Sequence, residues 1–320
     1  MIRKIRLILV ILLVSLNVAS QTRSDKLLNN LHDKNSKYIF VIAHRGDWRN
    51  APENSIQCIE NAIEMGVDMV EIDIQPTKDR NFICMHDETL ERTSTGVGAI
   101  KDYTTEELKK LVLRSGNGIK TRRQIPTLEE VLKVCKNRIL VNIDKGEKYI
   151  KEILPIIKKC DMEKQVIIKG KYPVEKVKES YGSSQGMLYM PIIDLWNDKS
   201  VASVQEFIKD FVPVAYELCF KDEKSLDLNI INSIIESGSR VWINTLWDSL
   251  CGGHDDENAL IEGKDTHWGW ILEHKATMIQ TDRPQELIHY LEEKGLRRIR
   301  CSNNVYKKCC YKWNYNKQHH

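Results

Sequence analysis

Short apolar runs alternate with amphipathic stretches along most of this 320-residue chain. Compact apolar runs bounded by turn residues predict buried strands, and apolar residues spaced three or four apart predict helices. The predicted strands are Tyr38–Ala43, Asp68–Ile74, Phe82–Met85, Ile139–Ile143, Val166–Ile168, Met187–Met190, Val212–Leu218, Val241–Asn244 and Thr277–Gln280. The predicted helices include Ser55–Met65, Leu128–Cys135, Tyr149–Lys159, Val201–Phe211 and Leu228–Glu236.

This alternation favours parallel strands joined by helical crossovers, and a (β/α)8 barrel is the closed solution at this length. The pattern gives one strand more than such a barrel needs, and it does not show which one is surplus. Between Asp73 and His86 there is no room for a crossover helix. We therefore expect the barrel to be irregular around its second and third strands, with a tight turn at Thr77–Asn81.

The two ends of the chain differ from its body. Residues 1–20 combine a basic start, the apolar run Leu7–Leu16 and the small residues Val18–Ser20, as in a cleaved secretory signal peptide. An uncleaved membrane anchor is the alternative. Residues 297–320 show no helical or strand period, so we expect a basic, disordered tail; the alternative is a basic and aromatic patch that contacts anionic lipid.

Composition narrows the function classes. A hydrophobic fraction of 42% with 29% charged residues is typical of a globular protein. Without the three basic residues of the signal and the seven from Arg297 onward, 38 basic side chains remain against 45 acidic ones, which argues against nucleic-acid binding. Several of the nine cysteines lie in or beside apolar segments (Cys58, Cys84, Cys135, Cys160 and Cys219), where we expect buried thiols.

Polar clusters follow or end the first apolar runs: His44–Gly46, Pro52–Asn54, Glu71 with Asp73, and His86 with Asp87. Glu71 and Asp73 lie two residues apart on a predicted strand, so both carboxylates point to one face. Two such carboxylates repel unless a cation lies between them, and a hard divalent ion is the usual partner. His44, His86 and Arg45 add a proton acceptor, a proton donor and a phosphate ligand. Phosphodiester hydrolysis needs these parts.

At these residues the chain resembles the glycerophosphodiester phosphodiesterase family. The family's HRG, PEN, ExD and HD motifs match the four clusters in order. Further family-like stretches lie at Thr77–Asp79, Arg92–Gly96, Ile125–Leu128 and Thr281–Pro284. The resemblance implies a TIM barrel over residues 36–296, with a small cap insertion at residues 88–124 over the barrel mouth. Within that insertion, Thr104–Leu108 is a capping-type helix start.

The resemblance also implies roles for individual residues. His44 and His86 would be the catalytic acid and base, in an order that the sequence does not decide, and Glu71 and Asp73 would be metal ligands. Arg45 would bind phosphate; a structural ion pair with Glu71 or Asp87 is the alternative.

Other positions depart from the family pattern or are ambiguous. The family usually has a glutamate on the fourth strand and a lysine two residues later, whereas this chain has Asp144 and then Lys145. We expect Asp144 to be the third metal ligand and Lys145 to contact phosphate. Glu53 is a ligand, a support or a helix N-terminal carboxylate. Trp242 lines the substrate pocket or packs in the core, and Lys169 ends a strand facing the site.

The expected function is that of an exported hydrolase, periplasmic or secreted, which cleaves glycerophosphodiesters to glycerol 3-phosphate and an alcohol. The resemblance suggests that the glycerol 2-hydroxyl attacks first and that water then opens a cyclic phosphate. One divalent ion, Ca²⁺, Mg²⁺ or Mn²⁺, is expected. The partner is a small-molecule diester, without nucleic acid and without stable membrane insertion after signal cleavage. Phospholipase C- or D-like activity on intact lipid and non-catalytic phosphate binding are the alternatives.

Overall fold

The computed structural model describes residues 21–182 and 188–297. The predicted signal peptide and residues 298–320 of the predicted tail lie outside these ranges. Arg297, the first residue of the predicted tail, is described; its guanidinium is 2.6 Å from a carboxylate oxygen of Asp68. Within the described ranges, no helix combines the length and apolar character that a membrane span requires.

Eight parallel strands close into a barrel in the part of the chain that the structure describes. Because β1 pairs with both β11 and β2, the sheet has no open edge between its first and last barrel strands. The barrel strands are β1 (Phe40–Ala43), β2 (Met69–Pro76), β6 (Leu140–Asp144), β7 (Val166–Gly170), β8 (Leu188–Asp194), β9 (Ala215–Cys219), β10 (Arg240–Asn244) and β11 (Met278–Thr281). Their burial on both faces explains why each reads as an apolar run. The predicted TIM barrel is confirmed.

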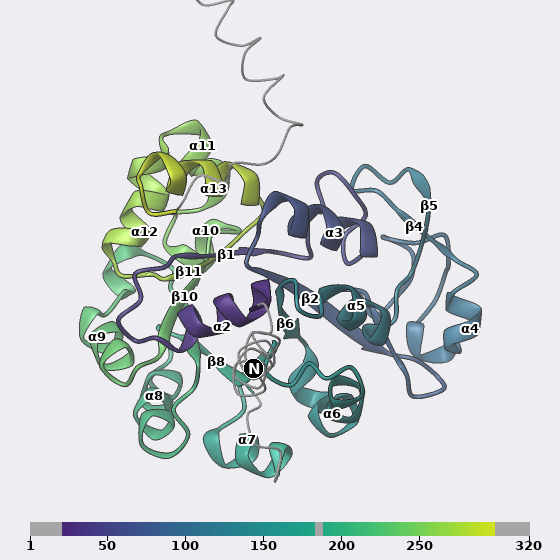
Figure 1. Ribbon diagram of the computed structural model, residues 1–320, viewed down its shortest axis with the longest axis horizontal. Coiled ribbons are helices and arrows are strands. Elements are labelled where there is room, and N and C mark those ends of the chain that lie inside the picture. Colours follow the sequence, from purple (N-terminus) through teal and green to yellow (C-terminus); the bar gives the residue numbers. More distant parts are fainter. Residues whose placement is uncertain (1–20, 183–187, 298–320) are drawn as a thin grey trace, which may run out of the picture.

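Helices form an outer ring around the strands (Figure 1). They are α3 (Ile56–Met65), α5 (Leu128–Cys135), α6 (Ile150–Lys159), α7 (Val174–Tyr181), α8 (Asp198–Asp210), α9 (Leu228–Glu236), α10 (Asp248–Cys251), α11 (Asp256–Ile261), α12 (Trp270–Glu273) and α13 (Pro284–Glu293). Three short helical turns accompany them: η2 (Gly146–Tyr149) lies between β6 and α6, η3 (Glu223–Ser225) between β9 and α9, and η4 (Asp265–Gly269) between α11 and α12. Their apolar faces pack on the outside of the barrel in one continuous core.

The surplus strand is β3 (Phe82–Cys84), which pairs antiparallel with the end of β2. The connection is a tight turn in which the Thr77 N–H donates to the Asn81 carbonyl. The predicted irregularity of the barrel therefore lies between β2 and β3, where the connection is too short for a helix. Since β3 is a hairpin partner rather than a barrel strand, the remaining predicted strands supply the eight barrel positions.

An N-terminal helix not predicted from the sequence, α2 (Arg23–His32), lies across the centre of the ring (Figure 1). Its buried Leu27 and Leu31 pack against an inner core made by strand residues, including Phe40 and Met69. Arg240 at the start of β10 donates to the carbonyls of Leu31, Ser36 and Asp33. This end of the barrel is filled by side chains, so chemistry is left to the C-terminal ends of the strands.

The insertion after β3 contains η1 (Ile100–Asp102), α4 (Thr105–Leu108), β4 (Val112–Arg114) and β5 (Lys120–Gln124). Its buried apolar residues form a small separate cluster with Ile83 of β3 and Met85, and it lies beside α3 and α5 (Figure 1). The predicted capping box is present, because Thr104 and Glu107 satisfy each other's backbone N–H groups.

The cysteines that the structure describes are all buried and free: Cys58, Cys84, Cys135, Cys160, Cys219 and Cys251. This confirms the expected buried thiols.

Candidate active site

Three carboxylates meet at the C-terminal ends of two neighbouring strands. Glu71 and Asp73 point to one face of β2, and in the parallel register with β6 Asp73 lies opposite Asp144. One oxygen from each carboxylate can be chosen so that all three lie within 4.8 Å of one another. Glu71 and Asp73 are each 1% exposed. This is an oxygen-donor set of the kind that hard divalent ions prefer.

The electrostatics of the cluster favour a cation. Burial and the neighbouring Asp73 raise the pKa of Glu71 to about 7. Burial acts in the same direction on Asp144, but Lys169 and Lys145 outweigh it and hold the pKa of Asp144 below its usual value. A divalent ion among these oxygens would offset the repulsion that makes Glu71 hard to ionise.

Asn54 holds Asp73 in place. Its amide nitrogen donates to Asp73 Oδ2 at 3.0 Å, and its side-chain oxygen accepts the Asp73 backbone N–H at 3.0 Å. Asn54 is 1% exposed and has φ +57°, a conformation that asparagine adopts more readily than most residues. The next residue, Ser55, caps α3. The asparagine of the predicted PEN motif therefore aligns a carboxylate of the cluster, a role that the sequence alone did not show.

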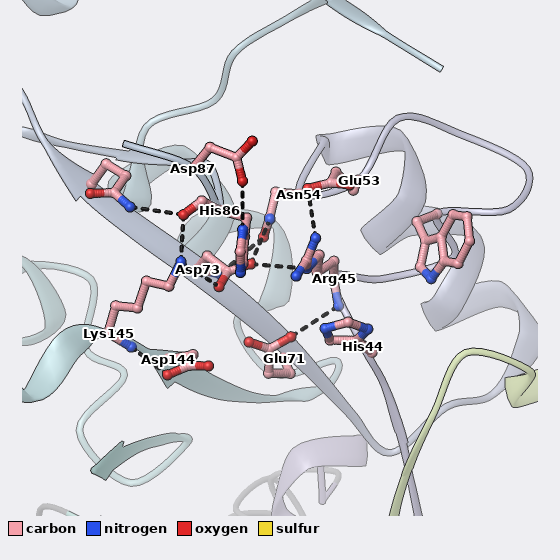
Figure 2. Close-up of polar contacts among 12 residues, drawn as sticks. His44, Arg45, Glu53, Asn54, Glu71, Asp73, His86, Asp87, Asp144 and Lys145 are labelled. Atoms are coloured by element: carbon pink, nitrogen blue, oxygen red, sulfur yellow. Dashed lines mark hydrogen bonds and ion pairs between the residues drawn. The ribbon is translucent and has the colours of Figure 1, made fainter. Parts of the chain in front are cut away.

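Arg45 occupies the tight turn after β1, with φ +53°. The following Gly46 has φ +77°, and a Cβ there would lie 2.6 Å from the Cys58 sulfur, so the turn requires glycine. The guanidinium donates to Glu53 at 3.0 Å, and its Nε is 3.3 Å from Asp73 Oδ2. Arg45 reaches Asp73 from the side opposite Lys145 (Figure 2).

The alternative prediction for Arg45 was an ion pair with Glu71 or Asp87. The structure gives it other partners, because the carboxylates nearest its guanidinium are those of Glu53 and Asp73. The hydrogen bond from Arg45 to Glu71 comes from the backbone N–H, at 3.1 Å, and not from the guanidinium. Glu53 lies outside the three-carboxylate cluster and accepts hydrogen bonds from the guanidinium groups of Arg45 and Arg92, as a support would. A helix N-terminal role for Glu53 stays a prediction.

Each candidate catalytic histidine is bound at Nδ1 by an aspartate. His44 Nδ1 lies 2.8 Å from Asp282 Oδ1, and His86 Nδ1 lies 2.6 Å from Asp87 Oδ1. An ionised carboxylate only accepts, so Nδ1 carries the proton and Nε2 is left for other partners. Burial lowers the pKa of His44, but the Asp282 hydrogen bond and Glu71 outweigh it and raise the pKa above its usual value. The sequence motifs included both aspartates but did not pair either of them with a histidine.

Arg92 links the insertion to the barrel. Its guanidinium binds both oxygens of Asp87, at 2.6 and 2.9 Å, and both oxygens of Glu53, at 2.8 and 2.9 Å. Arg92 and the His86 hydrogen bond hold the pKa of Asp87 well below its usual range, although burial opposes them. Planar two-point pairing is specific to arginine, so this residue fixes the orientation of the Asp87–His86 pair.

Two lysines flank the cluster. Lys145 has φ +61° and donates to the His86 carbonyl at 2.5 Å, with its Nζ 3.7 Å from Asp73 Oδ1. Lys169 is 4% exposed, and its Nζ lies 3.6 Å from Asp144 Oδ2 and 3.3 Å from Glu217 Oε2. Although burial acts in the opposite direction, Asp144 and Glu217 raise the pKa of Lys169 above its usual value.

Trp242 lies in the inner core with no exposed surface, and its indole N–H donates to Asn244 at 2.6 Å. The structure therefore agrees with the alternative in which Trp242 packs in the core. A contact between Trp242 and substrate stays a prediction. A different tryptophan, Trp247, is 48% exposed after β10 and lies edge-on to His44, with ring centroids 6.4 Å apart. The sequence did not single it out.

Comparisons with known proteins agree with this site. The model of the glycerophosphoryl diester phosphodiesterase family matches residues 44–176, and a second model, described as a domain of unknown function, matches residues 189–291. The first match contains both candidate histidines and the three carboxylates, and the second contains Glu217 and Asp282. The two matched segments therefore meet in one site.

Named relatives match parts of this chain. A glycerophosphodiester phosphodiesterase of Caldanaerobacter subterraneus is 35% identical over 198 residues, 57% of this chain and 82% of the relative. One of Bacillus subtilis is 43% identical over 103 residues, 29% of this chain and 35% of the relative.

Solved structures share the fold at lower identity. A Parabacteroides distasonis glycerophosphoryl diester phosphodiesterase has a TM-score of 0.72 at 24% identity, over 89% of this chain and 95% of its own. An Oleispira antarctica phosphodiesterase, solved with its product sn-glycerol 3-phosphate, has a TM-score of 0.60 at 19% identity, over 81% of this chain and 99% of its own.

Proposed function

Because this chain belongs to the glycerophosphodiester phosphodiesterase family and is thereby a phosphoric diester hydrolase, we propose that it is a metal-dependent enzyme that releases glycerol 3-phosphate and an alcohol. The observation that carries the proposal is the arrangement of charge at the barrel mouth. A three-carboxylate cluster lies between an arginine and a lysine, and two histidines are each held at Nδ1 by an aspartate.

The residues present fit one divalent ion. Glu71, Asp73 and Asp144 offer hard oxygen ligands at compatible spacing, and the raised pKa of Glu71 marks a site short of positive charge. Asn54 and the Lys145 backbone N–H, which donates to Asp144 at 2.6 Å, fix the orientation of two of the ligands. When bound, the ion would neutralise charge on the phosphoryl oxygens. Ca²⁺, Mg²⁺ and Mn²⁺ all suit such a donor set.

The protein's own groups would orient the diester and move its protons. Arg45 lies beside Asp73 and offers guanidinium N–H groups to phosphoryl oxygens. One histidine Nε2 takes the proton of the attacking hydroxyl, and the other gives a proton to the departing alcohol oxygen. If the glycerol 2-hydroxyl attacks first, the same two groups exchange roles when water opens the cyclic phosphate. The aspartate on each Nδ1 stabilises the imidazolium formed at each step.

The test is release of glycerol 3-phosphate from glycerophosphodiesters of choline, ethanolamine, inositol and glycerol, with chelator and after addition of each ion. Release that stops with chelator and resumes with an ion supports the proposal. Undiminished release in chelator contradicts the metal dependence, and a phosphorylated alcohol with free glycerol contradicts the proposed bond cleavage. Phospholipid vesicles in the same panel test action on intact lipid.

We also propose that the protein is exported. The support is the sequence of residues 1–20, with its basic start, short apolar run and small residues before Gln21. N-terminal sequencing of the native protein should return a chain that begins near Gln21. Retention of Met1, or of the protein in membranes, would contradict export.

A further inference from the structure

A buried lysine lies inside the barrel between two carboxylates. Lys169 follows two fully buried isoleucines on β7 and is 4% exposed. Its Nζ lies 3.3 Å from Glu217 on β9 and 3.6 Å from Asp144 on β6. Because β8 lies between β7 and β9, the contact with Glu217 spans the barrel interior rather than joining paired strands. A charged side chain so deeply buried is retained only where its charge is used or balanced.

Glu217 is itself held rigidly. Its Oε1 accepts the Asn244 amide at 2.8 Å, and Asn244 in turn accepts the Trp242 indole N–H. Its Oε2 is buried without a hydrogen-bond donor and faces Lys169. A connected set of contacts therefore runs from β10 through β9 and β7 to Asp144 on β6. The Lys169 charge is fixed at the edge of the candidate metal site.

The charge beside the ion affects how strongly the site attracts a diester, which itself carries one negative charge. Lys169, like Arg45 and Lys145, is an ion-pair partner of a carboxylate in the three-carboxylate cluster. Without the charge of Lys169 the ion-loaded site would be one unit more negative and would attract the diester less.

We propose that Lys169 is a fixed charge that serves phosphodiester binding: held by Glu217 beside Asp144, it adds one positive charge to the ion-loaded site. The inference rests on the proposed function and adds to it a residue outside the motifs that carry the family resemblance. It has a distinctive consequence, because Lys169 repels the metal ion and attracts the substrate anion. Loss of its charge should change the two affinities in opposite directions, whereas loss of a merely structural residue should weaken both.

The experiment measures two affinities by calorimetry, without turnover. Mn²⁺ is titrated into the metal-free protein, and sn-glycerol 3-phosphate into the Mn²⁺-saturated protein. Lys169→Met should bind Mn²⁺ more tightly, by roughly threefold or more, and glycerol 3-phosphate more weakly, by roughly tenfold. Glu217→Gln should bind Mn²⁺ more weakly than wild type and should not bind glycerol 3-phosphate more weakly. Lys169→Arg should stay close to wild type.

Lys171→Met is the matched control, since Lys171 follows the same strand but is exposed and paired with Asp194. It should leave both affinities unchanged. If Lys169→Met does not fold because Glu217 is left unpaired, the Lys169→Met change is made in the Glu217→Gln protein. The same opposite shifts are then expected between the Glu217→Gln protein and this double variant. Parallel weakening of both ligands, or no change, overturns the role of Lys169 alone. A wild-type protein that binds neither ligand overturns the proposed function and this inference together.

Discussion

The most informative single perturbation of the site is Asn54→Ala, because both hydrogen bonds of this side chain go to Asp73. The change removes the hydrogen bond to a carboxylate and the one from the Asp73 backbone, both 3.0 Å long and buried. A bond to a charged group contributes about 1.5–3 kcal/mol and a neutral one about 1 kcal/mol. Alanine at φ +57° adds about 1 kcal/mol of strain.

We therefore expect Asn54→Ala to lower the free energy of unfolding by about 3.5–5 kcal/mol. Since Asp73 also loses the donor that orients it, the Mn²⁺ concentration for half-maximal activity should rise by roughly tenfold. Urea unfolding followed by tryptophan fluorescence and metal titration of turnover measure the two effects.

Asn137→Ala is the matched control for backbone strain. Asn137 also has a positive φ, +62°, but its side chain is exposed and lies outside the site. It should lose only about 1 kcal/mol and keep the wild-type metal dependence. If Asn54→Ala is no less stable than Asn137→Ala and needs no more metal, the two hydrogen bonds do not position Asp73 and the reasoning is wrong.

Three further outcomes are expected. Asp144→Asn keeps the shape of a ligand but removes its charge, so the metal concentration needed for half-maximal activity should rise by at least roughly tenfold. Asp144→Glu should keep measurable activity. An Asp144→Asn protein with the metal dependence of wild type would place the third ligand elsewhere. Asp282→Asn removes a group that raises the pKa of His44. Whichever limb of the pH–rate profile His44 controls should therefore move to lower pH. An unmoved profile would exclude this effect of Asp282 on His44. The lysine of Arg92→Lys cannot pair with two carboxylates at two points each. Amide hydrogen exchange should therefore accelerate in residues 88–124 but not in the barrel strands. Unchanged exchange in residues 88–124 would show that Arg92 does not fix the insertion.

The barrel was predictable because its strands are buried on both faces and so appear as apolar runs separated by helical patterns. The same property hid the difference between a barrel strand and β3, since Phe82–Cys84 is as apolar as its neighbours. Only the short connection after β2 indicated a hairpin. Helix α2 was missed because it covers the barrel end with few buried residues, chiefly Leu27 and Leu31.

The motifs located the site but not its internal contacts. Asp282 binds His44 across 238 positions of sequence, a pairing that no local pattern encodes. The left-handed backbone of Lys145 directs its side chain to the His86 carbonyl, which spacing alone does not reveal. Glu217 did leave a signal: it is the one charged residue in the otherwise apolar strand Ala215–Cys219, and a lone charge in a buried strand calls for a partner.

The central claim is that His44 and His86 transfer the protons of a reaction at the Glu71–Asp73–Asp144 cluster. It is tested most directly by the turnover of His44→Ala and His86→Ala on glycerophosphodiesters at saturating metal, with Mn²⁺ affinity measured on the same preparations. We expect turnover to fall about 100-fold or more in each variant, with Mn²⁺ affinity little changed, because neither histidine is among the proposed ligands. Near-normal turnover in either variant would remove that histidine from the mechanism and contradict the account.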